Sequence, residues 1–301
     1  MFAFRKSDGA AFICGAEDVC RISDGSSTPY LVEPRLVEEF LKPVEPKYNW
    51  ACAIFDRCQV DPDAVFVIAG FAAFVTCCAP AGLRISARAM EDNLKITATL
   101  MDRMGLFSEK PPELGDRSVA EMISEGSLLF EADPKYPQAV GINGILDRTI
   151  AYGNFHWDIL INRFPDSPFF TSDFPIAIEP CRDLRIVNRI VPLTPSLAIR
   201  ICPRVELSGK KLNATFENFS YTFLKPSRTE ILDLNRTIVR SAEDLVFYPL
   251  SAEWVPRFVR KHSRYRVEND TIDIPDGTGF LSVTRTVVRE PRNGGRASTK
   301  V

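Results

Sequence analysis

At the centre of the chain runs Phe169-Phe170-Thr171-Ser172-Asp173-Phe174-Pro175-Ile176-Ala177-Ile178-Glu179, in which two apolar segments flank a short polar turn. Both segments have the composition of buried strands, so Thr171, Ser172 and Asp173 are expected where a buried sheet edge ends. Pro175 favours an extended backbone at Phe174 and fits the same turn. A carboxylate and two hydroxyls at such a place either form a site or fix the turn.

The sequence after this element has the pattern of a mainly antiparallel sheet with a few helices. Short runs rich in Ile, Val and Phe alternate with turn residues, and we expect strands over 157–162, 168–171, 176–178, 186–191, 197–201, 216–223, 245–248 and 265–267. Ser227 and Glu230 form a capping-box pattern that predicts a helix to about Ala242, and a second helix is expected over 251–262.

The sequence before this element predicts helices after a short β-hairpin. Phe2–Phe4 and Ala11–Ile13 flank the turn signal Ser7-Asp8-Gly9. Helical spacing of apolar residues follows, with helices expected from Pro34 and over 50–58, 62–79, 85–104, 118–125 and 138–149. The predicted fold class is therefore α+β. We expect a mostly helical lobe with the hairpin at 1–150, an α+β lobe at 151–288 and a disordered basic tail at 289–301.

The segment Ala64–Leu83 carries no charge over twenty residues and is long enough to be compared with a membrane span. Pro80 is expected to end the helix near Ala79, which leaves about 24 Å of helix against a ~30 Å hydrocarbon core. A helix that is apolar all round also fits the centre of a helical layer. The buried core helix is the favoured interpretation, and membrane association is the alternative.

The composition is that of a soluble globular chain. The chain has 301 residues, 45% apolar and 25% charged, with a net charge of −2. A slightly acidic chain is not expected to coat nucleic acid through bulk charge. No basic and apolar leader follows Met1, and the eight scattered cysteines lack zinc-site spacing, so reduced thiols, a cytoplasmic location and no metal are expected. No signature of a cofactor site is present.

Six polar residues are candidates for a site because each lies at the end of an element or on an apolar face. Asp173 and His156 are the catalytic candidates, as a carboxylate at a strand end and as a titratable ring between two aromatic residues. A turn-fixing Asp173 and a core histidine are the alternatives. The ligand-binding candidates are Arg84, Thr171, Ser172 and Asn235. Arg84 is either an anion clamp or a helix-end ion pair, whereas Asn235 needs a hydrogen-bond partner on its apolar helix face.

The segment Arg257–Arg266 is strongly basic, with Phe258 and Tyr265 interleaved. Such a segment can contact phosphates and stack on bases. A solvated helix face is the commoner explanation, and we do not expect a high-affinity nucleic-acid site.

Taken together, several segments resemble a largely bacterial, uncharacterised family catalogued as domain of unknown function 4238. The resemblance rests on these segments in order: Ile68–Phe74 with Pro80 and Arg84, His156–Leu160, Phe170–Pro175, Pro192–Pro195, Leu234–Arg236 and Ser241–Val246. Members usually begin with a His-x-Val-Pro-like segment that is missing here. If the family uses that histidine, the resemblance implies an incomplete or inactive chain. The resemblance supplies no reaction.

Two hypotheses about function follow from the residues. In the first, the six candidates converge on one polar pocket for a small anionic ligand. The protein is then a hydrolase, and a nuclease is one of the kinds of hydrolase considered. In the second, the protein is a non-catalytic binding or interaction protein and the same residues serve the fold. The sequence names no reaction, cofactor or oligomeric state that would decide between them.

Overall fold

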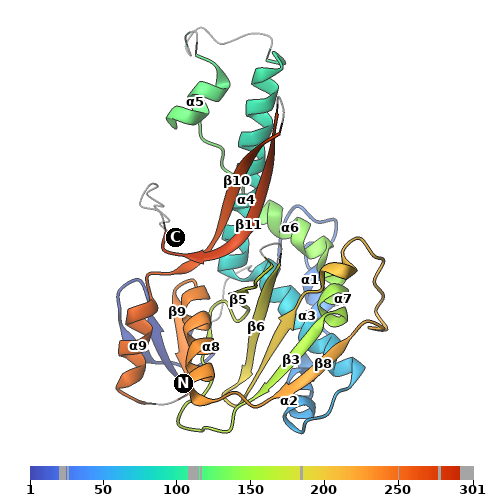
Figure 1. Cartoon of the computed structure of the whole chain (residues 1–301), viewed down its shortest axis with the longest axis vertical. Helices are drawn as coiled ribbons and strands as arrows, with labels where there is room; N and C mark the ends of the chain where they lie inside the picture. Colours follow the sequence, from blue (N-terminus) through green and yellow to red (C-terminus); the bar gives the residue numbers. More distant parts are fainter. Residues whose placement is uncertain are drawn as a thin grey trace.

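The fold is α+β, as the sequence predicts, with helices in the first half and mainly antiparallel sheets in the second (Figure 1). The computed structural model describes residues 1–19, 25, 27–107, 115, 117–183, 186–249, 251–276 and 279–291, with backbone only for 273–276 and 279–281. The expected linker at 110–112, residues 22–24 and 26 of the expected loop at 22–29, and the tail from 292 lie outside these residues.

The helices of the first half are α1 Leu36–Leu41, the short 3₁₀ turn η1 Glu45–Lys47, α2 Tyr48–Asp56, α3 Pro62–Cys78, α4 Pro80–Arg103, α5 Val119–Glu125, α6 Lys135–Asn143 and α7 Ile145–Asn154. The central one is α3, whose apolar surface is buried on nearly all sides. Its start follows from the sequence, because the Asp61 carboxylate accepts the N–H groups of Asp63 and Ala64 and Pro62 fits the first turn.

The start of α4 corrects the expectation of a helix from Ile85. Pro80 ends α3 but opens α4 within one residue, and the two helices meet at a bend of 58°. A Cβ at Gly82 would lie 2.2 Å from the Thr76 carbonyl oxygen, so only glycine lets α4 pack this closely on α3. No helix of the described chain has by itself the length and hydropathy of a membrane span, whereas the bent pair α3 and α4 passes that test when joined.

The larger sheet has the strand order β5-β6-β7-β3-β8. Its strands are β3 His156–Ile161, β5 Ala177–Pro180, β6 Val187–Thr194, β7 Leu197–Cys202 and β8 Ser220–Leu224, and all neighbours are antiparallel except β3 and β8. One face, with Trp157 and Ile159, packs on the helices around α3. Part of the other face packs on α8, Arg228–Ser241, which begins at the predicted capping box.

The smaller sheet joins the N-terminal hairpin to strands of the second half of the chain. Its order is β2-β1-β9-β4, formed by β2 Ala11–Ile13, β1 Phe2–Arg5, β9 Leu245–Tyr248 and β4 Thr171–Ser172. The N-terminal hairpin thus pairs with a strand more than 240 residues later rather than with the helices that follow it. The main apolar core also contains residues from both sides of position 150.

The last described elements are the helix α9, Trp254–His262, and a long antiparallel hairpin of β10, Arg266–Asp276, and β11, Gly279–Arg289. The sequence predicts only a short strand at 265–267 here. In Figure 1 the hairpin follows α4 away from the two sheets, and two contacts fix it there. Asn269 Nδ2 donates to the Ile85 carbonyl at 2.7 Å, and Thr271 Oγ1 lies 3.1 Å from an Asp92 carboxylate oxygen.

Candidate functional site

Asp173 connects its own turn to a segment about seventy residues later in the chain. Its carboxylate accepts hydrogen bonds from the backbone N–H groups of Glu243, Asp244 and Leu245 at 2.9, 2.7 and 2.8 Å. It therefore fixes the turn between α8 and β9 rather than its own turn. Burial raises the pKa of Asp173 to about 6, and the three N–H donors act against that shift. Asp173 stays ionised at neutral pH.

Lys6 reaches the same turn from the N-terminal hairpin. Its ammonium donates to the carbonyl oxygens of Val239 and Ala242 at the end of α8, at 3.2 and 2.6 Å, and to that of Tyr265 at 2.6 Å. A cation is favourable at a helix C-terminus, where carbonyl groups lack helical partners. Burial nevertheless lowers the pKa of Lys6 to about 8, although the charge of Asp173 opposes the change. Sequence reasoning did not select Lys6.

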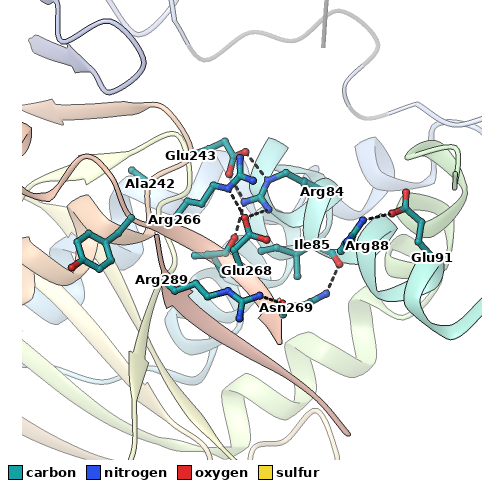
Figure 2. A network of polar contacts seen from close by, with 12 residues as sticks. Arg84, Ile85, Arg88, Glu91, Ala242, Glu243, Arg266, Glu268, Asn269 and Arg289 are labelled. Carbon is teal, nitrogen blue, oxygen red and sulfur yellow. Dashed lines mark hydrogen bonds and ion pairs between the residues drawn. The ribbon is translucent and has the colours of Figure 1, made fainter. Parts of the chain in front are cut away.

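Arg84 lies between two carboxylates at the base of α4, as Figure 2 shows. Its Nε and Nη2 donate to the two carboxylate oxygens of Glu243, both at 2.7 Å, and Nη2 also donates to the Val267 carbonyl. Glu268 lies 3.4 Å from Nη1. Burial lowers the pKa of Arg84, but both ion pairs outweigh this and raise it above its usual value. These contacts match the helix-end ion pair, because the guanidinium is already bidentate with protein carboxylate.

Asn235 and Ser172 are both buried and tie the chain around β4. Asn235 accepts from the Phe170 N–H at 2.9 Å and donates to the Pro168 carbonyl at 2.8 Å. Ser172 Oγ accepts from the Phe174 N–H at 3.2 Å. Asn235 thus fastens α8 to the chain just before β4, the partner that its place on an apolar face predicts.

Thr171 lies on the opposite face of β4 from the neighbouring Ser172, and it lines a cleft. The cleft has a volume of about 1270 Å³ and lies between α1, η1 and α3 on one side and β4 and β9 on the other, and the end of β6 with the turn after it also lines the cleft. Ser172 and Asp173 also contribute to its wall. The apolar lining includes Leu41, Tyr48, Phe71, Phe74, Leu193 and Phe247. Tyr48 and Phe71 pack with ring centroids 4.9 Å apart, so aromatic side chains form much of the helical wall.

His156 lies elsewhere, in a cluster on the larger sheet that we call the β3–β8 polar cluster: His156 and Asp158 of β3, Arg200 of β7 and Ser220 of β8. His156 Nδ1 is 2.9 Å from Ser220 Oγ, and Nε2 is 3.2 Å from Asp158 Oδ1. Arg200 donates to the other oxygen of Asp158 at 3.1 Å. Strand register explains the grouping, since His156 pairs with Ser220 and Asp158 pairs with Arg200.

Arg200 also holds a second carboxylate. Its Nη2 donates to Glu179 at 3.0 Å, and Asn188 donates to the other oxygen of Glu179 at 2.8 Å. Glu179 therefore faces the β3–β8 polar cluster and not Asp173. Within the described ranges, no group of three or more histidine, cysteine or carboxylate side chains is arranged to hold a metal ion.

The six candidates consequently occupy four places rather than one pocket. Arg84 and Asp173 meet at the turn 243–245, Asn235 is buried under β4, and His156 belongs to the larger sheet, while Thr171, Ser172 and Asp173 border the cleft. Sequence reasoning missed Asp158, Ser220 and the aromatic wall. Alternation along β3 was the available signal for Asp158, because His156 and Asp158 are two residues apart.

The basic segment contributes much of α9, which packs by its apolar side. Val255 and Val259 are fully buried in the core beside α8, and Phe258 contacts Phe170 with ring centroids 6.1 Å apart. Arg260 is exposed and donates to the Gly9 carbonyl at 3.4 Å. The basic residues thus border an amphipathic helix, and the expectation of no tight nucleic-acid site stays a prediction.

Comparison with known proteins identifies no relative: neither a family model, nor a curated protein, nor a solved structure matches this chain.

Proposed function

We propose that the protein is a binding protein for a small organic ligand that is apolar over most of its length and lies in the cleft beside Thr171. The observation that carries this proposal is the cleft itself. Its volume of about 1270 Å³ exceeds the ~300–1,000 Å³ of ordinary ligand pockets, so an elongated ligand fits it best. Most of the lining is apolar or aromatic, as is usual for such sites, with Thr171, Ser172 and Asp173 on the sheet wall and the charged Glu38, Lys42 and Glu45 on the helical wall.

Thr171 and Asp173 lie on the sheet wall of the cleft and favour a polar end of the ligand there. Thr171 offers a hydroxyl as donor and acceptor, and Asp173 brings a carboxylate with a perturbed pKa, as is common at binding sites. Because Asp173 is ionised at neutral pH, an uncharged hydroxyl or amide end of the ligand suits this wall better than an anion. Arg84, the expected anion clamp, is committed to Glu243.

The cellular setting is part of the proposal. Seven cysteines lie in the described chain and all are free thiols, which suits a reducing cytoplasm. Membership of the largely bacterial family of domain of unknown function 4238 also remains a proposal, supported by the order of the segments that resemble it.

The test uses N-phenyl-1-naphthylamine, an uncharged apolar fluorophore. We expect it to bind with a saturable fluorescence increase, and we expect Thr171→Trp to weaken binding at least tenfold by filling the cleft. Thr97→Trp, at an exposed position on α4, is the matched control and should bind like the wild type. Equal binding by both variants, with unfolding midpoints unchanged, would place the probe elsewhere and refute the proposal.

A further inference from the structure

The β3–β8 polar cluster is a second candidate site, on a different part of the fold from the cleft. Its three reactive side chains lie in a line across two parallel strands: Ser220 Oγ is 2.9 Å from one ring nitrogen of His156, and Asp158 Oδ1 is 3.2 Å from the other. A hydroxyl, an imidazole and a carboxylate in this order are the parts of an activated serine nucleophile, which is recognised by geometry and not by sequence position.

The carboxylate end of this line is held rigidly. Asp158 is fixed by Arg200, and Arg200 is fixed in turn by Glu179. An oriented carboxylate selects the imidazole tautomer with its proton on Nε2, toward Asp158. Nδ1 is then unprotonated and accepts the hydrogen bond from the Ser220 hydroxyl. That arrangement is the one that a general base needs.

The hydroxyl end of the line is open to a substrate. The His156 side chain is 31% exposed, and Ser220 is only partly buried. Strand β8 is at the edge of its sheet, so alternate backbone N–H groups along it face away from β3. Such groups are available to bind the oxygen that becomes negative when a carbonyl is attacked.

We propose that Ser220 is the nucleophile and His156 the general base of an esterase activity toward small carboxylic esters, with Asp158 as the residue that positions His156. Ser220 Oγ bonds to the carbonyl carbon of the ester and gives its proton to His156 Nδ1. The bond from that carbon to the alcohol oxygen breaks, and His156 returns the proton to the departing alcohol.

The acylated serine is then hydrolysed by the same groups. Water gives a proton to His156 and attacks the carbonyl carbon, the bond to Ser220 Oγ breaks, and the proton returns to Ser220. One ester and one water yield one alcohol and one carboxylic acid, so the cycle needs no oxidant, reductant or cofactor. The cluster faces away from the helices that form the cleft, and the activity therefore does not depend on a ligand there.

The experiment measures hydrolysis of p-nitrophenyl acetate by the full-length protein, together with mass spectrometry of the acetylated peptide. We expect turnover above the buffer rate, an acetyl group on Ser220, and loss of both in Ser220→Ala. Because general-base catalysis contributes about 10²–10⁴-fold, His156→Gln should lower the acylation rate at least a hundredfold. Ser196→Ala, which removes an exposed hydroxyl at the β6–β7 turn, is the matched control and should keep the full rate.

A second measurement reads the environment of residue 220 without ester turnover. In Ser220→Cys, alkylation by iodoacetamide should be at least tenfold faster at residue 220 than at the exposed Cys58, and His156→Gln in that background should remove the difference. Absence of acetylation at Ser220, or acetylation that persists unchanged in His156→Gln, would overturn the proposal. Alkylation at residue 220 no faster than at Cys58 would overturn it as well.

Discussion

Replacing Asp173 with alanine tests whether this carboxylate holds the two halves of the chain together. The substitution removes three hydrogen bonds to the backbone N–H groups of 243–245. Without the carboxylate these three N–H groups lose their acceptor, at about 1–3 kcal/mol each, or about 6 kcal/mol together. The rise in the pKa of Asp173 from 3.8 to about 6 is the net result of burial and the three bonds, so the ionised group is about 3 kcal/mol less stable than in water, and the substitution recovers that amount.

The expected result is therefore a loss of about 3 kcal/mol in the free energy of unfolding, measured by urea denaturation at pH 7.5. Asp173→Asn keeps one acceptor oxygen and should lose less. The matched control is Asp166→Ala, which breaks an exposed ion pair with Arg228 and should leave the free energy of unfolding almost unchanged. An Asp173→Ala protein as stable as this control would show that the three bonds do not hold the turn, and the reasoning would fail.

Three further predictions concern the same region. In a double-mutant cycle, Arg84→Met and Glu243→Gln should show a coupling of about 1–3 kcal/mol in unfolding free energy, because Arg84→Met removes the bidentate partner of Glu243 and Glu243→Gln leaves Arg84 with Glu268 alone. Additive effects would contradict the bidentate pair. The side chain of Lys6, followed by NMR, should titrate with a pKa near 8, and Asp173→Asn should lower that pKa further. Because the folded state releases this proton at lower pH than the unfolded state does, the contribution of Lys6 to stability rises between pH 8 and about 10.5. A titration midpoint near 10.5 in the folded protein would refute this. Asn235→Leu should cost about 2–4 kcal/mol by stranding a buried N–H and a buried carbonyl, and a shift in urea midpoint equivalent to less than 1 kcal/mol would show that both groups find other partners.

Elements with strong local signals could be predicted from the sequence. The capping box Ser227–Glu230 opens α8 as expected, and β9 spans the predicted residues 245–248. The buried α3 follows from its unbroken apolar composition. In each case the information lies within one turn or one strand, so no distant partner is needed to read it.

Elements whose form depends on distant partners could not be predicted. The expected strand at 168–171 shrinks to Thr171–Ser172 because the Phe170 N–H bonds to Asn235 and the Phe169 N–H bonds to Pro195. The long hairpin of β10 and β11 was missed because β10 is rich in charged residues, whereas the Val- and Thr-rich pattern of β11 was a strand signal that went unused. Its side-chain partners include Ile85 and Asp92 on α4, which lie about 180 residues earlier.

The same distinction separates the candidate residues by role. Asp173, Lys6 and Arg84 come from three distant segments, and all three bind the short connection from Ala242 to Leu245. These hydrogen bonds serve the fold, which explains a carboxylate at a buried sheet edge, whereas Thr171 of the same element lines the cleft.

The groups left for a ligand or a reaction come together only through strand register. Ser220 is 64 residues from His156, and no spacing in the sequence connects them; the parallel pairing of β3 with β8 does. Asp173, Arg84 and Asn235, which the sequence singles out, therefore stabilise the fold, whereas His156 meets Asp158 and Ser220, which it does not single out, at an accessible surface. If that division is correct, Asp173→Ala should lower stability while folded Ser220→Ala keeps it, and only the second change should abolish acetylation of the serine.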